Sequence, residues 1–400
     1  MSKIGELMKK LCPNGVEFEE LQSVANITIG EFIHKNKQII NGKYPVFNGG
    51  ITNTGFYDES NNTANKIVIS ARGANAGYVN KILVDYWAGN SCYSISIKNK
   101  DLIDWVFVFY YLKQNQTNLT DEQQKGGIPA VSKKMVEKIK IPIPPLEVQE
   151  EIVRILDTFT ALISELKAEL EARKKQYEYY REKLIIPKEI NGKWFLNGKE
   201  IEWKKLGDVG EFIRGNGLQK KDFTESGVGC IHYGQIYTYY NTYAYKTKSF
   251  VTEELAKRLK KVNKGDLIIT NTSENIEDIG KTVAWLGENE IVTGGHATIF
   301  KHNQNSKYLA YYTQTKMFFN EKKKYARGTK VIEISTKDLA KIHIPIPTLS
   351  EQQRIVEILD KFDTLVNDLS IGIPAEIEAR QKQYEYYRNK LLSFKEINNE

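Results

Sequence analysis

Basic side chains gather around one tyrosine between residues 322 and 330. Five bases and one aromatic ring fall within nine positions: Lys322, Lys323, Lys324, Tyr325, Arg327 and Lys330. Such clusters neutralise phosphate groups, so they favour a polyanionic ligand. A solvated lysine surface explains these residues about equally well when they are considered alone.

A second candidate for nucleic-acid chemistry follows a predicted strand at residues 66–70. Arg72 and Asn75 come directly after this β-branched run, in the sequence Arg-Gly-Ala-Asn. Arginine and asparagine on a loop are able to pair with base edges. An ordinary turn explains the same residues nearly as well.

Signatures of catalysis are incomplete throughout the sequence. Gly280-Lys281-Thr282 resembles the end of a phosphate-binding loop, but Asn275 stands where that motif needs its first glycine. The sequence has no Asn-Pro-Pro-aromatic motif of adenine methyltransferases, and no proline is followed by aspartate as in common nucleases. Cys230 and His232 form a lone pair without further ligands nearby. We therefore expect no catalytic residues and no metal site.

Length and composition indicate a soluble protein of two or three domains. The longest apolar run, Trp105 to Leu112, is too short to span a bilayer. The first eleven residues predict a short amphipathic helix rather than a signal peptide, so we expect a cytoplasmic protein that does not enter a membrane. Three distant cysteines predict no disulfide framework.

The elements that must position these residues are two long helices with one repeated pattern. Apolar side chains recur at alternating spacings of four and three in both, which is the seam of a coiled coil. The first seam reads Ile152, Leu156, Phe159, Ile163, Leu166, Leu170, Arg173, Tyr177, Tyr180 and Leu184. The second reads Ile355, Leu359, Phe362, Val366, Leu369, and then Ile377, Arg380, Tyr384, Tyr387 and Leu391.

The second helix carries four extra residues next to Pro374, because the offset between the copies grows from 203 to 207. Proline inside a helix removes a hydrogen bond, so we expect a break or kink near 371–375. Thr348 with Glu351 predicts a capping box at the start of this helix.

Two matching stripes in one chain most simply bury each other. An antiparallel pair places Tyr177 and Tyr180 near Ile355 and Leu359, and Tyr384 and Tyr387 near Ile152 and Leu156. Each helix of about 40 residues is then a rod of about 60 Å.

Two mostly β heads are expected beside these helices. The predicted domains are a first head at 1–143, a helix at 144–187, a second head at 188–346 and a helix at 347–400. Each head ends in an extended strap with alternating prolines, Ile141-Pro142-Ile143-Pro144 and Ile344-Pro345-Ile346-Pro347. Each helix region has a net charge of −2, so the remainder carries about +11, a weak lean toward a polyanionic partner.

The chain resembles the specificity subunit of type I restriction–modification enzymes. The resemblance covers nearly the whole chain and is carried by the two heads, the straps and the repeated helix ending in Gln-Tyr-Glu-Tyr-Tyr-Arg. The second copy, Ile373-Pro374-Ala375-Glu376-Ile377-Glu378-Ala379-Arg380, is the more specific. The first copy lacks the Gly-x-Pro element and has Val148 where Glu351 stands.

The resemblance implies an α+β protein that is not itself an enzyme. Two target recognition domains would each read one half of a bipartite, asymmetric site in double-stranded DNA, and an antiparallel coiled coil with pseudo-two-fold symmetry would set the spacer. Two modification subunits with S-adenosylmethionine would dock on the helices, and restriction subunits using ATP and Mg would join them. No cofactor would bind this chain directly.

Candidate residues follow from this reading. Those for DNA contact are Lys35, Lys37, Arg72, Asn75, Arg214, Lys281, Lys322, Lys323, Lys324, Arg327 and Lys330. Those for partner contact lie off the seam and are Tyr179, Arg181, Tyr386 and Arg388. The main alternative is a coiled-coil scaffold that presents two β domains to protein ligands, and a weaker one is a stand-alone nuclease or methyltransferase.

Overall fold

The computed structural model describes residues 3–121 and 129–397. The chain divides into two compact units, Met1–Glu165 with Ile377–Glu400, and Leu166–Glu376. Each unit therefore combines one predicted head with parts of both long helices. The chain has both α-helices and β-sheets, which confirms the expected α+β class.

The elements of the first head follow the N-terminal helix in short succession. They are α1 (Lys3–Leu11), β1 (Glu17–Glu20), α2 (Leu21–Val24), β2 (Ala25–Ile29), η1 (Lys35–Lys37), β3 (Tyr44–Phe47), β4 (Gly55–Tyr57), β5 (Lys66–Ser70), β6 (Val79–Ile82), β7 (Trp87–Ala88), β8 (Cys92–Ile97), α3 (Trp105–Gln114), α4 (Gln116–Asp121), α5 (Lys133–Glu137) and β9 (Lys140–Ile143).

An antiparallel sheet in the order β2-β8-β5-β6 forms the centre of the first head. Its β-branched residues fill the core, with Ile67, Ile69 and Ile95 at most 1% exposed. The apolar run that begins at Trp105 forms helix α3. This helix packs on the core through Phe107 rather than spanning a membrane.

The second head has more strands. Its elements are β10 (Lys188–Ile190), β11 (Lys193–Leu196), β12 (Lys199–Glu200), β13 (Glu202–Lys205), α7 (Leu206–Val209), β14 (Gly210–Arg214), η2 (Lys220–Asp222), β15 (Val228–Ile231), α8 (Tyr233–Thr238), β16 (Tyr243–Ala244), β17 (Ser249–Val251), α9 (Glu253–Arg258), β18 (Lys260–Val262), β19 (Leu267–Thr270), β20 (Thr272–Ser273), β21 (Thr282–Trp285), β22 (Ile291–Thr293), β23 (Ala297–His302), α10 (Ser306–Tyr312), α11 (Lys316–Tyr325), β24 (Ile332–Glu333), α12 (Thr336–Leu339) and β25 (His343–Ile346).

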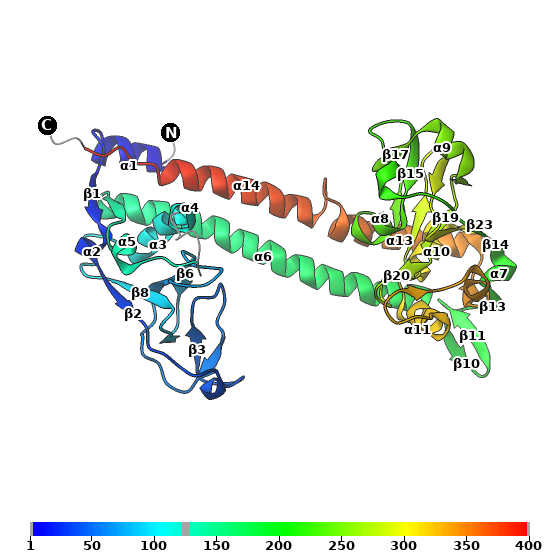
Figure 1. Ribbon diagram of the computed structural model, residues 1–400, viewed down its shortest axis with the longest axis horizontal. Coiled ribbons are helices and arrows are strands. Elements are labelled where there is room, and N and C mark those ends of the chain that lie inside the picture. Colours follow the sequence, from blue (N-terminus) through cyan, green and yellow to red (C-terminus); the bar gives the residue numbers. More distant parts are fainter. Residues whose placement is uncertain (1–2, 122–128, 398–400) are drawn as a thin grey trace. The chain divides into compact units, whose positions relative to one another are not determined.

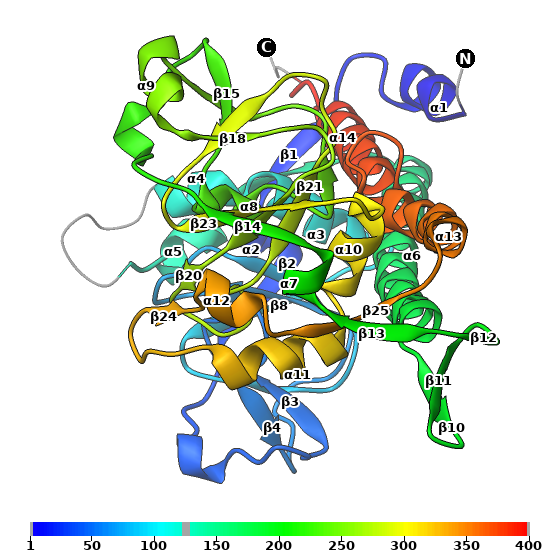
Figure 2. The ribbon, with the colours of Figure 1, turned by 90° about the vertical axis from the view of Figure 1, so that its right-hand side faces the viewer.

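Two larger sheets organise the second head. The five-stranded sheet has the order β14-β23-β19-β21-β16, and the four-stranded sheet has the order β17-β15-β22-β18. Strands β15 and β18 lie with α9 on one side of the head, and α11 and α12 lie on the other (Figure 2). The β14-β23-β19 core matches β2-β8-β5 of the first head, so the two heads share a common sheet despite their different sequences.

The proline straps are strands of small two-stranded sheets. Strap β9 pairs antiparallel with β1, which places Phe18 opposite Pro142. Strap β25 pairs with β13 and places Trp203 opposite Pro345 in the same way. Proline is tolerated because each strap is paired on one side only. The entry and exit of each head are thereby joined next to a long helix.

The first long helix, α6 (Leu146–Ile185), is continuous (Figure 1). In the first unit its N-terminal part packs with the C-terminal part of α14 (Ile373–Leu391), where Tyr387 stacks on Phe159 at 5.5 Å between ring centroids. Tyr384 is buried in one cluster with Ile152 and Leu156.

The second unit repeats this arrangement with the helices exchanged. The C-terminal part of α6 packs with α13 (Leu349–Asn367), and Tyr180 stacks on Phe362 at 5.3 Å between ring centroids. Tyr177 is buried in one cluster with Ile355 and Leu359. In both units the N-terminal part of one long helix packs against the C-terminal part of the other, which confirms the expected antiparallel coiled coil.

The second long helix is interrupted at residues 368–372, between α13 and α14. The break lies three residues earlier than we expected, because Pro374 falls in the first turn of α14, where its missing N–H costs no hydrogen bond. Asp368 accepts from the Ser370 and Ile371 amides at 2.7 and 3.1 Å. A Cβ at Gly372 would lie 2.5 Å from the Thr364 carbonyl oxygen, so the turn needs glycine.

The start of α13 is capped by half of the expected capping box. Thr348 Oγ1 accepts from the Glu351 amide at 3.4 Å. The Glu351 carboxylate pairs with Arg354 at 2.6 Å and with Asn197 at 3.0 Å, so it does not return to the cap residue. Within the described ranges, no helix is both long and apolar enough to cross a bilayer.

Candidate nucleic-acid interface

Three strands of the first head present their loops at the same end of the sheet. Strands β2 and β5 end there at Ile29 and Ser70, and β8 begins there at Cys92. The Ala71 amide donates to the Ser91 carbonyl at 2.8 Å, and the Ser91 amide donates to Asn48 Oδ1 at 3.1 Å. The Gly30 amide, after β2, donates to the Cys92 carbonyl at 3.2 Å. Together these hydrogen bonds bring four loops into one surface, which we call the loop face of the head.

Arg72 and Asn75 lie on this loop face, as their position after β5 predicts. Arg72 is exposed and Asn75 is partly exposed. Gly73 has φ +94°, which favours glycine, and its amide donates to the Pro129 carbonyl at 2.9 Å. The turn closes where the Gly77 amide donates to Ser70 at 2.8 Å. A fixed turn therefore holds both side chains toward solvent.

Lys35 and Lys37 lie on the neighbouring loop, residues 30–42. Both are exposed on the single turn η1, and Ile33 anchors this turn with 5% exposure. Gly30 begins the loop so close to β7 that a Cβ would lie 2.3 Å from the Ala88 carbonyl oxygen. Two candidate lysines and the Arg72 turn thus belong to one end of one sheet.

The second head builds the same loop face. Strand β14 ends at Arg214, β19 ends at Thr270 and β23 begins at Ala297. The Gly215 amide donates to the Ala297 carbonyl, and the Gly280 amide donates to Thr270, both at 2.9 Å. They match two bonds of the first head, from the Gly30 amide to the Cys92 carbonyl and from the Gly77 amide to the Ser70 carbonyl.

Sequence reasoning missed the loop at residues 215–227, whose two lysines are balanced by Asp222 and Glu225. It matches residues 30–42 at a constant spacing of 185, with buried Leu218 at the place of Ile33 and exposed Lys220 at the place of Lys35. Glycines begin and end both loops. The sequence contained a signal for this loop, namely the repeat at 185 residues, which differs from the spacing of 203 between the helices.

The polar groups of the second loop face are largely engaged with one another. Arg214 pairs with Glu333 at 2.7 Å and also donates to the Gly295 carbonyl at 3.3 Å. His296 Nδ1 and Thr272 Oγ1 are 2.9 Å apart. Arg214 is therefore an ion-paired residue at the rim of this face. To bind a phosphate, it must first break its ion pair with the Glu333 carboxylate.

His232 caps α8 next to this face. Its Nδ1 accepts from the Gly234 amide at 3.2 Å, and the side chain is buried. Burial, with the charges of Lys220 and His296, lowers the pKa of His232 to about 4. The ring is therefore neutral near pH 7, which suits its role as a hydrogen-bond acceptor.

The basic cluster of α11 is divided between the surface and the interior. The structure corrects our assignment of Lys322, which is 3% exposed and donates to the Glu277 carbonyl at 3.0 Å and to the Ile279 carbonyl. Burial, with the nearby Lys281 charge, lowers the pKa of its amine to about 8. In this position Lys322 ties α11 to the loop before β21 and is not available to a phosphate.

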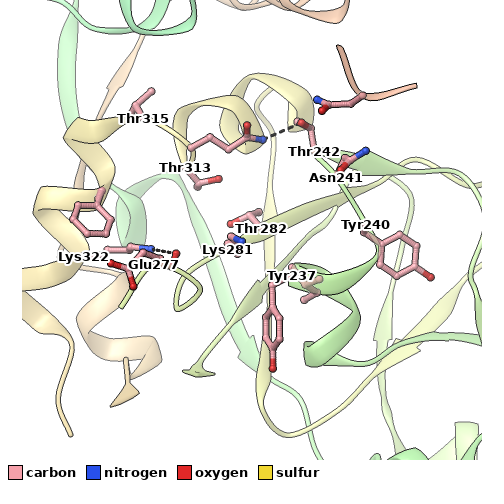
Figure 3. Close-up of a pocket in the computed structure, with 14 residues that line it drawn as sticks. Tyr237, Tyr240, Asn241, Thr242, Glu277, Lys281, Thr282, Thr313, Thr315 and Lys322 are labelled. Carbon is pink, nitrogen blue, oxygen red and sulfur yellow. Dashed lines mark hydrogen bonds between the residues drawn. The ribbon is translucent and has the colours of Figure 1, made fainter. Parts of the chain in front are cut away.

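Lys281 and Lys322 both line a cavity of about 360 Å³ in the second unit (Figure 3). Lys281 is exposed and pairs with Asp278 at 2.7 Å. The cavity also contains Gln314, which donates to Thr242 at 2.9 Å. Glu277 also lines the cavity and its negative charge opposes an anionic ligand, so we assign no phosphate to this cavity.

The remaining members of the cluster face solvent. Lys323, Lys324, Arg327 and Lys330 are all exposed. Lys324 pairs with Glu321 on its own helix, whereas the Arg327 backbone pairs with Glu333, the partner of Arg214. The exposed part of the cluster is thereby joined to the loop face of the second head.

The partner candidates separate into tyrosines that are exposed and arginines that are not. Tyr179 and Tyr386 are 58% and 60% exposed. Arg181 lies 5.2 Å from the ring of Tyr177, and Arg388 lies 5.5 Å from that of Tyr384, so both guanidinium groups cover seam tyrosines. The exposed tyrosine recurs in both units.

Matching anchors attach each head to its long helix. Tyr110 donates to Asp157 at 2.6 Å, and Tyr311 donates to Asp360 at 2.7 Å. A lysine also forms an ion pair with each carboxylate: Lys81 with Asp157 at 3.2 Å, and Lys307 with Asp360 at 2.7 Å. A pair of buried glutamines, Gln149 and Gln352, makes a further repeated contact with the backbone that begins α3 and α10.

The two heads have the same loop face, and each is anchored in the same way to a helix of an antiparallel pair. They define a duplicated module for ligand recognition. Residues 13–172 and 198–379 match the family model for the type I restriction modification DNA specificity domain. The chain belongs to this family, which confirms the resemblance found in the sequence. The family's role is specificity, and it implies DNA sequence recognition.

Curated relatives agree with this assignment. The chain is 36% identical over 306 residues to the type I restriction enzyme EcoR124I/EcoR124II specificity subunit of Escherichia coli, covering 74% of this chain and 72% of the relative. It is 33% identical to a putative type I restriction enzyme specificity subunit of Haemophilus influenzae, covering 97% of this chain and 98% of the relative.

A solved structure shares the fold. The crystal structure of the type I restriction–modification S subunit from M. genitalium matches with a TM-score of 0.61 at 18% identity. The match covers 95% of this chain and 97% of that one.

Proposed function

We propose that this chain is the DNA-reading subunit of a type I restriction–modification complex, and that each head reads one half of a bipartite, asymmetric site. The predicted boundaries, 1–143 and 188–346 for the heads and 144–187 and 347–400 for the helices, describe the modules of this proposal. The observation that carries it is the loop face, which both heads build with the same hydrogen bonds and different side chains.

Different side chains on one scaffold suit the reading of two different sequences. The first head presents Arg72 where the second has Thr272 bonded to His296. Arginine donates two hydrogen bonds to guanine, whereas a threonine–histidine pair offers a different donor and acceptor pattern. Phosphate contacts from Lys35, Lys37, Lys220, Lys323, Lys324 and Lys330 would position the heads without carrying sequence information.

The chemistry belongs to partners in this proposal. Two modification subunits with S-adenosylmethionine dock on the helices, one beside Tyr179 and one beside Tyr386, because these exposed tyrosines recur in both units. Restriction subunits with ATP and Mg join that complex. The chain itself supplies DNA contacts and spacing and no catalytic residue.

Methylation-aware sequencing of DNA from cells that carry this chain and its modification subunit tests the proposal. We expect methylated adenines in one bipartite motif. Exchange of residues 15–143 for the first head of another family member should change one half of the motif and leave the other half and the spacer unchanged. A change in both halves would contradict independent reading.

The scaffold alternative makes a different prediction. If the heads bind proteins, the assembled complex will show no salt-dependent affinity for duplex DNA, and exchange of a head will leave methylation unaltered. Lys35 of loop 30–42 and Lys220 of loop 215–227 stand at matching places, and this favours the DNA reading, since a protein-binding role does not require lysine there.

A further inference from the structure

The loop of residues 30–42 exposes large apolar side chains that none of the described residues of the first unit covers. Phe32 is 60% exposed and Ile40 is 88% exposed. Phe32 contacts the edge of the His34 ring, with 4.7 Å between the ring centroids. Apolar side chains of this size at the surface indicate a binding site when they are grouped.

The matching loop of the second head lacks this feature. At the same spacing of 185, Gly217 stands for Phe32 and exposed Glu225 stands for Ile40. Both loops retain the buried anchor and the lysine at 35 or 220. The fold of the loop therefore does not require Phe32 or Ile40, and their exposure is a property of the first head alone.

Charge next to these side chains favours DNA over a protein. Lys35 and Lys37 are exposed between Phe32 and Ile40, and Lys43 follows directly. Glu31 is the acidic residue of the loop, so residues 30–43 have a net positive charge. Proteins that insert an apolar wedge between two base pairs of DNA commonly flank that side chain with lysine or arginine, which holds the adjacent phosphates.

We propose that Phe32 inserts against a base step of the half-site read by the first head, with Lys35 and Lys37 on the flanking phosphates and Ile40 as a second apolar contact. This proposal rests on the proposed DNA-reading function. The wedge partly unstacks one step and makes the first half-site sensitive to how easily that step opens. The second head, with glycine at the matching place, reads its half-site without a wedge.

The test uses the complex of the full chain with its modification subunits and duplexes that carry 2-aminopurine at successive positions of both half-sites. Unstacking raises the fluorescence of this base. We expect a rise that depends on Phe32 at one step of one half-site, and a Phe32→Ala variant that loses this rise and binds roughly ten-fold more weakly. A base extruded for methylation gives a separate signal that persists in the variant.

Leu83→Ala is the matched control. Leu83 is 61% exposed, like Phe32, but follows β6 at the opposite end of the same sheet from the loop face. It should leave both fluorescence and affinity unchanged. Phe32→Leu keeps an apolar side chain and should retain part of the affinity.

Three results would overturn the wedge. They are an unchanged signal in Phe32→Ala, an equal loss in Leu83→Ala, and loss of assembly with the modification subunit while the assembled fraction binds DNA normally. The last would assign the loop to a protein interface. Failure of the unaltered complex to bind duplex DNA would instead contradict the proposed function itself, so the two failures are distinguishable.

Discussion

Tyr110 Oη donates a 2.6 Å hydrogen bond to Asp157, and this bond joins the first head to its long helix. Tyr311 and Asp360 repeat it at 2.7 Å in the second unit, at spacings of 201 and 203 from their counterparts. Burial, with the bond to a carboxylate, raises the pKa of both tyrosines, so they remain protonated donors at ordinary pH. Each bond is thus one of the contacts that hold a head on its helix.

Removal of either hydroxyl should loosen one head at a time. Tyr110→Phe and Tyr311→Phe each delete a hydrogen bond to a charged group, which costs about 1.5–3 kcal/mol of unfolding free energy. Chemical denaturation followed in each variant measures the loss, and hydrogen exchange localises it to the unit that contains the substitution. Tyr179→Phe, at an exposed ring, serves as control. Equal loosening of both units in either variant would contradict separate anchors.

The two kinds of lysine in α11 should respond differently to alanine. Lys322→Ala leaves the Glu277 and Ile279 carbonyls without their donor, so we expect a loss of about 1–3 kcal/mol of stability and no change in the salt dependence of DNA binding. Lys323→Ala, Lys324→Ala and Lys330→Ala should leave stability unaltered. Each of the three that contacts a phosphate should reduce the slope of log K against log salt by about 0.9.

Binding of the complex to a duplex at several salt concentrations measures these slopes, and urea unfolding measures stability. Lys337→Ala, an exposed lysine of α12, is a control for a general change in surface charge. An unchanged slope in all three surface variants would remove this cluster from the DNA interface.

Acid should destabilise the second unit through two histidines whose pKa values are lowered in the fold. The pKa of His232 is about 4 in the fold against an ordinary 6.5, so the unfolded chain binds more protons between these values. Stability therefore falls as pH drops from about 6.5 to about 4, by at most about 3 kcal/mol for this residue. His302, whose pKa burial also lowers to about 4, adds to the same window.

His232→Asn separates the two contributions. Asparagine keeps an acceptor for the Gly234 amide, so α8 retains its cap while one titrating group is lost. The dependence of unfolding free energy on pH between 4 and 6.5 should become shallower and not vanish. An unaltered slope would mean that His232 is accessible to protons in the fold.

The periodic features of this fold could be predicted from the sequence because they are local. The strands at 66–70 and 267–270 were expected at the positions where they occur, since a short run of β-branched residues predicts a buried strand. The helix seam was likewise readable, and Tyr177 and Tyr384 are buried on it. The repeat then fixed the antiparallel pairing.

The candidate site was less predictable because it depends on contacts between distant residues. The prediction that Lys322 lies at the surface was wrong, because it treated three successive lysines as one surface. Successive residues of a helix point about 100° apart. The spacing of four between Lys322 and buried Phe318 indicated the inward direction. The Tyr110–Asp157 contact spans 47 residues, and no local pattern reports it.

The last prediction concerns the distance between the half-sites. If the helices set the spacer, four residues added to both should lengthen each by about 6 Å, which corresponds to roughly one to two base pairs at about 3.4 Å each. The added residues also turn each helix by about 40° beyond a full rotation, so some affinity should be lost. The half-site sequences should not change, because the loop faces are untouched.

The structure selects where these insertions belong. An insertion after Leu369 falls in the break at 368–372, where a loop would absorb it, so it serves as the control with an unchanged spacer. The matched insertions belong after Glu165 in α6 and after Glu376 in α14, where the chain passes from one compact unit to the other. Methylation-aware sequencing reports both spacer and half-sites. An unchanged spacer with full activity would refute the helices as the spacer, and an altered half-site would refute the separation of reading from spacing.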